Sequence, residues 1–152
     1  MLFRSPAEEA SAIADLSEQG IDLDVAVVSR HPGGALATSS ASMTAWSDRS
    51  GQLTTDRGRV VLHGQMHHPT HAEFVPVAAG SSNDDSDQAR PLRIDGAEPV
   101  IGVGYGNEIA EAARCLRAGL RESPWVPHAQ TLSLMRQLDA VREQIGVHHP
   151  GT

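Results

Sequence analysis

The chain has 152 residues, a net charge of −7 and a sequence pI near 5.5. Aromatic residues make up 3% of the chain. Because the net charge is negative and no run of Lys or Arg occurs, the basic surface that binding to nucleic acid or an anionic membrane requires is absent. Its single cysteine, Cys115, excludes an internal disulfide and a cysteine pair for zinc. We expect Cys115 to be a small buried residue on a helix of a cytoplasmic protein.

The N-terminal residues show no apolar run of a signal peptide, and no stretch approaches the roughly 20 apolar residues of a membrane span. We expect residues 1–5 to be a non-native or disordered leader and residues 6–152 to form one domain. Between Ser5 and Glu18 a capping-box pattern, with Pro6 at the first helical position, locally favours a helix.

The next segment predicts a β-hairpin. Apolar and polar residues alternate from Ile21, and "HPGG" then turns the chain into "ALATSSASMTAW". One face of this second strand carries mostly small side chains: Ala35, Ala37, Ala41, Met43 and Ala45. A face so poor in bulk suits close approach by another layer, and we expect a second subunit to associate around Ala37, Ala41 and Met43.

Further strands are predicted in the middle of the chain. "QLTTDRGRVVLHG" indicates two short strands joined at Asp56 and Arg57, with Gly58 supplying a permissive backbone angle. Residues 72–78 predict another strand, which Pro76 would confine to an edge or a bulge. Residues 80–90 are polar and rich in turn formers, which is typical of a surface loop.

The C-terminal part predicts two amphipathic helices. Asn107 is expected to cap the first helix and Gly119 to end it, while Gly146 ends the second. The apolar stripes are Ile109, Ala113, Leu116 and Leu120 on the first, and Leu134, Leu138, Val141 and Ile145 on the second. Both stripes need a surface to cover them, so the predicted fold class is α+β: a large, mainly antiparallel open sheet with helices packed on one face.

Candidate chemical motifs are sparse. His63, His67, His68 and His71 gather near Glu73, but the adjacent His67 and His68 would face opposite sides of a strand, so we favour ordinary exposed histidines and assign no metal ligand. "GVGYG", residues 102–106, lacks the G-x-G-x-x-G spacing of a dinucleotide loop and is interpreted as a structural turn. No serine lies in a G-x-S-x-G motif.

From about Pro6 to Thr152 the sequence resembles the C-terminal domain of the Gfo/Idh/MocA family of oxidoreductases, especially its dihydrodiol dehydrogenase-like members. The residues that carry the resemblance are "GYGNEIAEAARCLRAGLRESPWVPHAQTLSLMRQLDAVREQIGVHHPG", supported by "GIDLDVAVVSRHPGGALATSSAS" and "LTTDRGRVVLHG".

The resemblance implies a two-domain oxidoreductase that uses NAD or NADP in its full-length form and acts on a sugar, polyol or dihydrodiol-type small molecule. It implies that a Rossmann domain missing from this chain binds the cofactor, and that the present domain forms one wall of the substrate cleft and pairs with another subunit through its sheet. It also implies a strand over residues 9–17, against the local helix pattern, because tertiary context overrides weak propensity.

The family's G-x-G-x-x-G loop and the E-K-P segment with its catalytic lysine have no counterpart in this sequence. No catalytic or cofactor-binding residue is therefore assigned, and we expect this chain alone to bind no cofactor and to be inactive. By resemblance Val100 and Tyr105 are candidate cleft-lining residues, although Tyr105 could equally pack on the sheet. The alternative function is a stand-alone, non-catalytic binding or scaffold module of the same fold.

Overall fold

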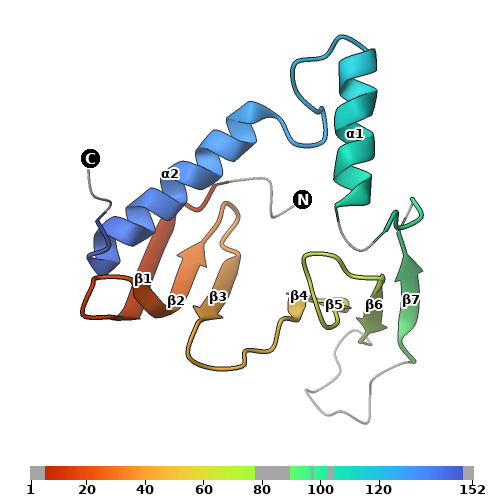
Figure 1. Cartoon of the computed structure of the whole chain (residues 1–152). Coiled ribbons are helices and arrows are strands. Elements are labelled where there is room, and N and C mark those ends of the chain that lie inside the picture. Colours follow the sequence, from red (N-terminus) through yellow and green to blue (C-terminus); the bar gives the residue numbers. More distant parts are fainter. Residues whose placement is uncertain (1–5, 78–89, 97, 103–104, 149–152) are drawn as a thin grey trace. The chain divides into compact units, whose positions relative to one another are not determined.

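The computed structural model describes residues 6–77, 90–96, 98–102 and 105–148, and Figure 1 shows its helices and strands. The predicted leader at residues 1–5 lies outside these residues, as does the predicted loop at 80–90 except for Arg90. The chain divides into two compact units. Unit 1 comprises Met1–Ser47 with Cys115–Thr152, and unit 2 comprises Asp48–Arg114.

Unit 1 contains an antiparallel sheet of strand order β1-β2-β3, made of β1 (Glu9–Leu16), β2 (Asp22–Arg30) and β3 (Leu36–Ser42). The predicted hairpin of β2 and β3 is confirmed, and Gly33 and Gly34 in its turn have φ of 82° and 81°. These positive angles favour glycine, which explains why the "HPGG" signal could be recognised.

The strand expected over residues 9–17 is also confirmed as β1, and the local helix pattern is overridden. Residues Glu9 to Asp15 pair in continuous register with β2, so the backbone groups are satisfied by the ladder. The even-numbered residues from Ala10 to Leu16 are half-buried, whereas Ile13 on the opposite face is 76% exposed. Such alternation is the period of a sheet covered on one side only.

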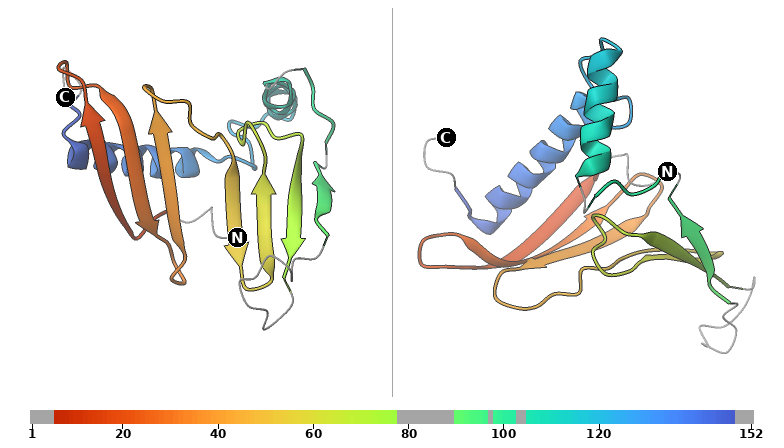
Figure 2. Two further views of the ribbon diagram at one scale, coloured as in Figure 1. Left: turned by 90° about the horizontal axis from the view of Figure 1, so that it is seen from below. Right: turned by 45° about the vertical axis from the view of Figure 1, so that its right-hand side comes forward.

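The cover on unit 1 is α2 (His128–Ile145), which packs against β1 (Figures 1 and 2). The predicted end of this helix is confirmed, because Gly146 adopts φ 78° and forms the left-handed C-cap. At the other end Pro127 provides no side-chain cap. Instead, Oε2 of Glu122 accepts a hydrogen bond of 2.6 Å from the backbone N–H of His128.

The predicted apolar stripe of α2 is only partly buried. Val141 and Ile145 are half-buried, but Leu134 and Leu138 are exposed. The helix meets β1 and the residue Ala7 before it partly through amides: Oε1 of Gln137 accepts from the Ala7 N–H at 2.8 Å, and Gln144 bonds the backbone of β1. The amide of Gln144 satisfies backbone groups on the open edge of β1.

Unit 2 contains a second antiparallel sheet of order β4-β5-β6-β7. The elements are β4 (Gly51–Thr55), β5 (Gly58–Leu62), β6 (His71–Pro76) and β7 (Leu92–Asp95). The first three confirm predicted strands. The strand β7 was not predicted, because its four residues are all exposed and form no recognisable apolar run.

Two details of unit 2 follow from backbone sterics. Gly58 has φ 140°, and a Cβ there would collide with the carbonyl oxygen of Val75, so only glycine fits. The expectation that Pro76 confines its strand to an edge or a bulge is wrong, since β6 lies between β5 and β7. Proline is tolerated because it is the last residue of β6, and β7 pairs only as far as Phe74.

The first predicted helix is α1 (Gly106–Arg117), which ends shortly before Gly119 at φ 68°. The expected burial of its apolar stripe is wrong: Ile109 is 68% exposed and Leu116 is 77% exposed. The expected burial of Cys115 on a helix is confirmed, because it is 6% exposed and lies on α1. The α+β class with antiparallel sheets is thus confirmed, but among the described residues only α2 has substantial contact with a strand.

The apolar core is very small. Among the described residues, Val75 and Cys115 are the buried apolar side chains. In the described part of the chain, none of the helices has the length and apolarity to cross a membrane.

Candidate functional site

The segment before α1 contains both predicted cleft residues. Val100 is 60% exposed and Tyr105 is 74% exposed, and both belong to unit 2. Tyr105 is therefore not packed on the sheet in this chain. The two side chains offer an apolar surface and one phenolic hydroxyl, which suit contact with a small hydroxylated molecule.

The shape of this segment is fixed by Asn107. Its Oδ1 accepts a 2.9 Å hydrogen bond from the Ile101 N–H, and its Nδ2 donates a 3.0 Å bond to the carbonyl oxygen of Pro99. Gly106 permits this closure, because a Cβ at that position would collide with the Ile101 carbonyl oxygen. Asn107 was predicted as a helix cap, and it instead holds the preceding loop, a role that the sequence pattern did not distinguish.

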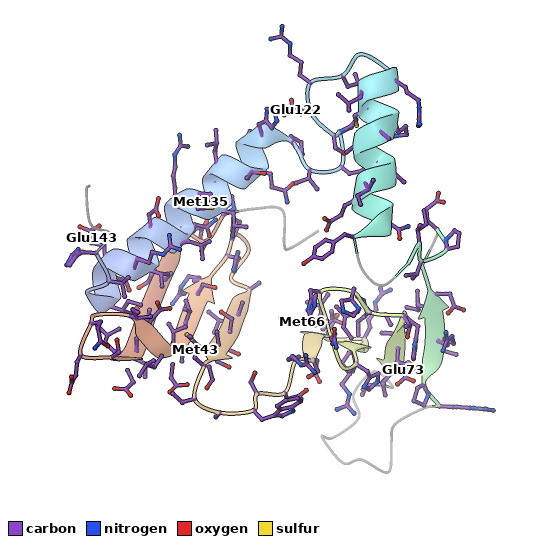
Figure 3. All side chains as sticks on the ribbon, in the orientation of Figure 1. Met43, Met66, Glu73, Glu122, Met135 and Glu143 are labelled. Atoms are coloured by element: carbon purple, nitrogen blue, oxygen red, sulfur yellow. The ribbon has the colours of Figure 1, made fainter. Side chains whose placement is uncertain are left out.

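Two of the four clustered histidines, His63 and His71, lie beside Glu73. On unit 2, Nε2 of His63 lies 2.8 Å from Oε2 of Glu73, while Nε2 of His71 lies 3.7 Å from its Oε1 (Glu73 is labelled in Figure 3). The hydrogen bond from His63 lowers the pKa of Glu73 below its ordinary value. His67 and His68 form a separate edge-to-face pair. Within the described ranges, no group of three or more His, Cys, Asp or Glu side chains is arranged to hold a metal ion.

A hollow of about 490 Å³ lies on the sheet of unit 1. It is lined by two rows of cross-strand neighbours, Ile13 with Ala26 and Ser40, and Asp15 with Asp24 and Ser42, together with Ala14, Val25, Ala41 and Ala45. Asp24 is the organised polar group here: Thr44 Oγ1 donates a hydrogen bond of 2.5 Å to Asp24 Oδ2. Hydrogen bonds from Ser42 and Thr44 lower the pKa of Asp24.

The residues that the structure describes do not fit a dinucleotide. A pyrophosphate site needs a glycine-rich turn between a parallel strand and a helix whose first N–H groups are available. Here α1 follows β7, which pairs antiparallel with β6, and the Asn107 side chain ties the preceding loop. Gly104 and Val103 of the "GVGYG" turn lie outside the described residues.

Comparisons with known proteins match this chain to part of longer proteins. No family model matches it. Trans-1,2-dihydrobenzene-1,2-diol dehydrogenase of Bos taurus is 27% identical over 151 residues, which cover 94% of this chain and 41% of that protein. The chain therefore spans less than half the length of the curated relatives that it matches.

Two solved structures share the fold. UDP-N-acetylglucosamine 3-dehydrogenase from Acidithiobacillus ferrooxidans superposes with a TM-score of 0.71 at 11% identity, over 93% of this chain and 42% of that one. Aldose-aldose oxidoreductase from Caulobacter crescentus superposes with a TM-score of 0.53 at 13% identity, over 92% of this chain and 39% of that one. The predicted resemblance to dihydrodiol dehydrogenases and to Gfo/Idh/MocA-type oxidoreductases is confirmed.

Proposed function

We propose that residues 6–152 are the C-terminal, substrate-side and oligomerisation domain of an NAD(P)-dependent oxidoreductase acting on a sugar, polyol or dihydrodiol-type hydroxy compound. The observation that carries this proposal is the asymmetry of the match, which takes in 94% of this chain but 41% of the dehydrogenase. The larger, unmatched part of such an enzyme would contain the Rossmann domain that holds NAD or NADP.

The exposed apolar residues on the two helices support this role. The apolar residues Ile109 and Leu116 on one helix, and Leu134 and Leu138 on the other, are exposed. A domain that normally packs against further protein would leave such stripes uncovered when it is taken alone.

Within this proposal Val100 and Tyr105 line the substrate cleft. Asn107 acts as a positioning residue, because its two hydrogen bonds hold the loop that precedes α1. A bound nicotinamide would supply hydride chemistry. The present chain would supply a wall that orients the substrate and limits its access to water. Because it carries no assigned proton acceptor, we expect the chain alone to be inactive. Its one cysteine suits a reducing compartment, and we propose a cytoplasmic location.

The first experiment detects the native protein with antibodies raised against this chain. We expect a band well above 16.1 kDa, and a purified longer protein that reduces NAD or NADP with trans-dihydrodiols, sugars or polyols. The 152-residue chain should give no such reduction under the same conditions. A native band at the mass of this chain would favour the stand-alone scaffold, and turnover by the isolated chain would overturn the assignment.

A further inference from the structure

Met66 lies in the connection between β5 and β6, residues 63–70, which belongs to unit 2 (Figure 3). Its backbone N–H donates a hydrogen bond of 2.8 Å to the carbonyl oxygen of Arg49, just before β4 begins at Gly51. The β5–β6 connection is therefore fastened to the start of β4 by a backbone hydrogen bond.

The thioether of Met66 makes a second contact with the start of β4, because it lies against Gly51. A Cβ placed at Gly51 would lie 3.2 Å from Sδ of Met66 and 3.7 Å from Cδ1 of Leu62. Gly51 does not have a left-handed φ, so the close approach of Met66 is the reason that this position favours glycine. Gly51 and Leu62 form the last cross-strand pair of β4 and β5, and the sulfur therefore covers the end of that ladder.

Oxidants can reach this sulfur, because Met66 is 51% exposed. Met43 is 75% exposed and Met135 is 42% exposed, so exposure alone does not distinguish Met66. The contact of its sulfur with a strand end does distinguish it, because a change at the sulfur then reaches the sheet. The thiol of Cys115 is protected from oxidation by burial.

We propose that Sδ of Met66 is a site of reversible oxidation by peroxides, and that the sulfoxide releases the β5–β6 connection from β4. The peroxide transfers one oxygen atom to sulfur: its O–O bond breaks, an S–O bond forms, and it leaves as water or an alcohol. Sulfur is oxidised by two electrons and the peroxide is reduced by two. Methionine sulfoxide reductases, with a dithiol as the reductant, return the thioether. This inference goes beyond the proposed oxidoreductase role and does not depend on it.

The sulfoxide is incompatible with the contact that the thioether makes. Its oxygen is strongly polar, whereas the sulfur lies against the backbone carbon of Gly51 and close to a methyl group of Leu62. Placing a polar oxygen against such atoms without a hydrogen bond is unfavourable, and the close contact leaves little room for a larger group. We therefore expect the oxidised side chain to turn to solvent. Because strand ends open with a small free energy, loss of this contact should free the start of β4.

Hydrogen exchange on the full 152-residue chain tests the coupling. The chain is treated with hydrogen peroxide and then with dithiothreitol, which reverses a sulfenic acid or disulfide at Cys115 but leaves methionine sulfoxide in place. Peptide mass spectrometry assigns each remaining oxygen to its residue. Once Met66 is oxidised, amides in residues 49–66 should exchange about tenfold faster, whereas β1 and β2 of unit 1 should exchange as before. Treatment with reductases specific for both sulfoxide epimers should restore the original exchange.

Three variants identify the sulfur that is responsible. Met66→Leu keeps an apolar side chain without sulfur, so peroxide should no longer change the exchange of residues 49–66. Met43→Leu is the matched control at a more exposed methionine, and this variant should respond to peroxide as the parent chain does. Gly51→Ala adds a methyl group that displaces the sulfur, so Met66 should be oxidised about twofold faster or more, since susceptibility follows exposure.

The same measurements can overturn the inference. It fails if complete oxidation of Met66 leaves the exchange of residues 49–66 unchanged, or if the Met66→Leu variant responds to peroxide as strongly as the parent chain. An unchanged oxidation rate in the Gly51→Ala variant would show that the sulfur does not lie against Gly51 in solution. Exchange that stays fast after both reductases have acted would refute reversibility. The assignment to an oxidoreductase stands in each case.

Discussion

Nε2 of His63, just after β5, lies 2.8 Å from Oε2 of Glu73 on the neighbouring strand β6. The hydrogen bond lowers the pKa of Glu73 from its ordinary value of 4.5. A carboxyl group with a depressed folded-state pKa stabilises the protein at pH values above its unfolded pKa. That contribution is lost as the pH falls below 4.5 and through the lower folded-state value.

We therefore expect Glu73→Gln to reduce the stability of the chain at neutral pH and to flatten the fall in stability below pH 4.5. Urea unfolding at a series of pH values measures both effects. Glu18→Gln, in the exposed turn after β1, is the matched control and should change the stability by no more than about 0.5 kcal/mol at neutral pH. If the free energy of unfolding falls equally below pH 4.5 in the Glu73→Gln variant and the parent chain, the contact with His63 does not persist in solution.

Gly58 is the glycine on which the β4-β5 turn depends. Its φ is 140°, and a Cβ added there would overlap the Val75 carbonyl oxygen and lie 2.9 Å from the Cα of Pro76, so no side chain fits. Gly58→Ala should lower the free energy of unfolding by about 2 kcal/mol or more. Gly34→Ala, at a φ of 81° but with no atom nearby, should cost about 1 kcal/mol. Equal costs in a denaturant titration would argue against the close approach.

Val75 and Leu116 should respond differently to truncation. Val75 is 5% exposed, so Val75→Ala should cost about 2 kcal/mol in the free energy of unfolding. Leu116 is 77% exposed, so Leu116→Ala in this chain should change the stability by no more than about 0.5 kcal/mol. In a longer protein that covers α1, the same substitution should cost about 2 to 5 kcal/mol. A small effect in both contexts would show that nothing covers this stripe.

Gln144 joins α2 to the edge of β1 through two hydrogen bonds. Its Nε2 donates to the carbonyl oxygen of Ala10 at 3.0 Å, and its Oε1 accepts from the Ala12 N–H at 3.2 Å. Gln144→Ala should lower the free energy of unfolding by about 1 kcal/mol, because both bonds are exposed. Glu143→Ala, at the neighbouring exposed position, should have an effect below about 0.5 kcal/mol in the same denaturant titration.

The proposed cleft residues are tested in the longer oxidoreductase proposed above. Tyr105→Ala should lower kcat/KM about tenfold if the phenol ring contacts the substrate. Trp46→Ala removes an exposed aromatic ring from unit 1 and should leave kcat/KM unchanged. Steady-state kinetics on a dihydrodiol or sugar provide the measurement, and equal kinetics for both variants would remove Tyr105 from the cleft.

Most of the elements were predictable because local signals and ladder pairing agreed. The "HPGG" turn, Gly58 and Gly146 each require a backbone angle that glycine supplies, and each marks its boundary correctly. For β1 the local capping box was misleading, and only the resemblance to a known domain indicated a strand. Pairing with β2 decides that structure, and it is a long-range property that a local pattern does not contain.

Burial was predicted less well than secondary structure. The stripe of Ile109 and Leu116 shows correctly that α1 is amphipathic, but it does not say which protein covers that stripe. Gln137 and Gln144 were overlooked because polar residues on a helix are ordinarily assigned to solvent, whereas here Gln144 bonds the edge of β1 and Gln137 bonds Ala7 just before it. The predicted cleft position of Val100 and Tyr105 depends on a neighbouring domain and stays a prediction.

The side-chain amide of Gln144 limits how the β1-β2-β3 sheet can grow. An aggregate that grows by strand pairing needs each molecule to offer two free sheet edges, so that each edge strand can form hydrogen bonds with a neighbouring molecule. At Ala10 and Ala12 the outer edge of β1 is already occupied by a side chain. Fibril-like extension along this sheet would therefore require α2 to detach from the edge of β1 first.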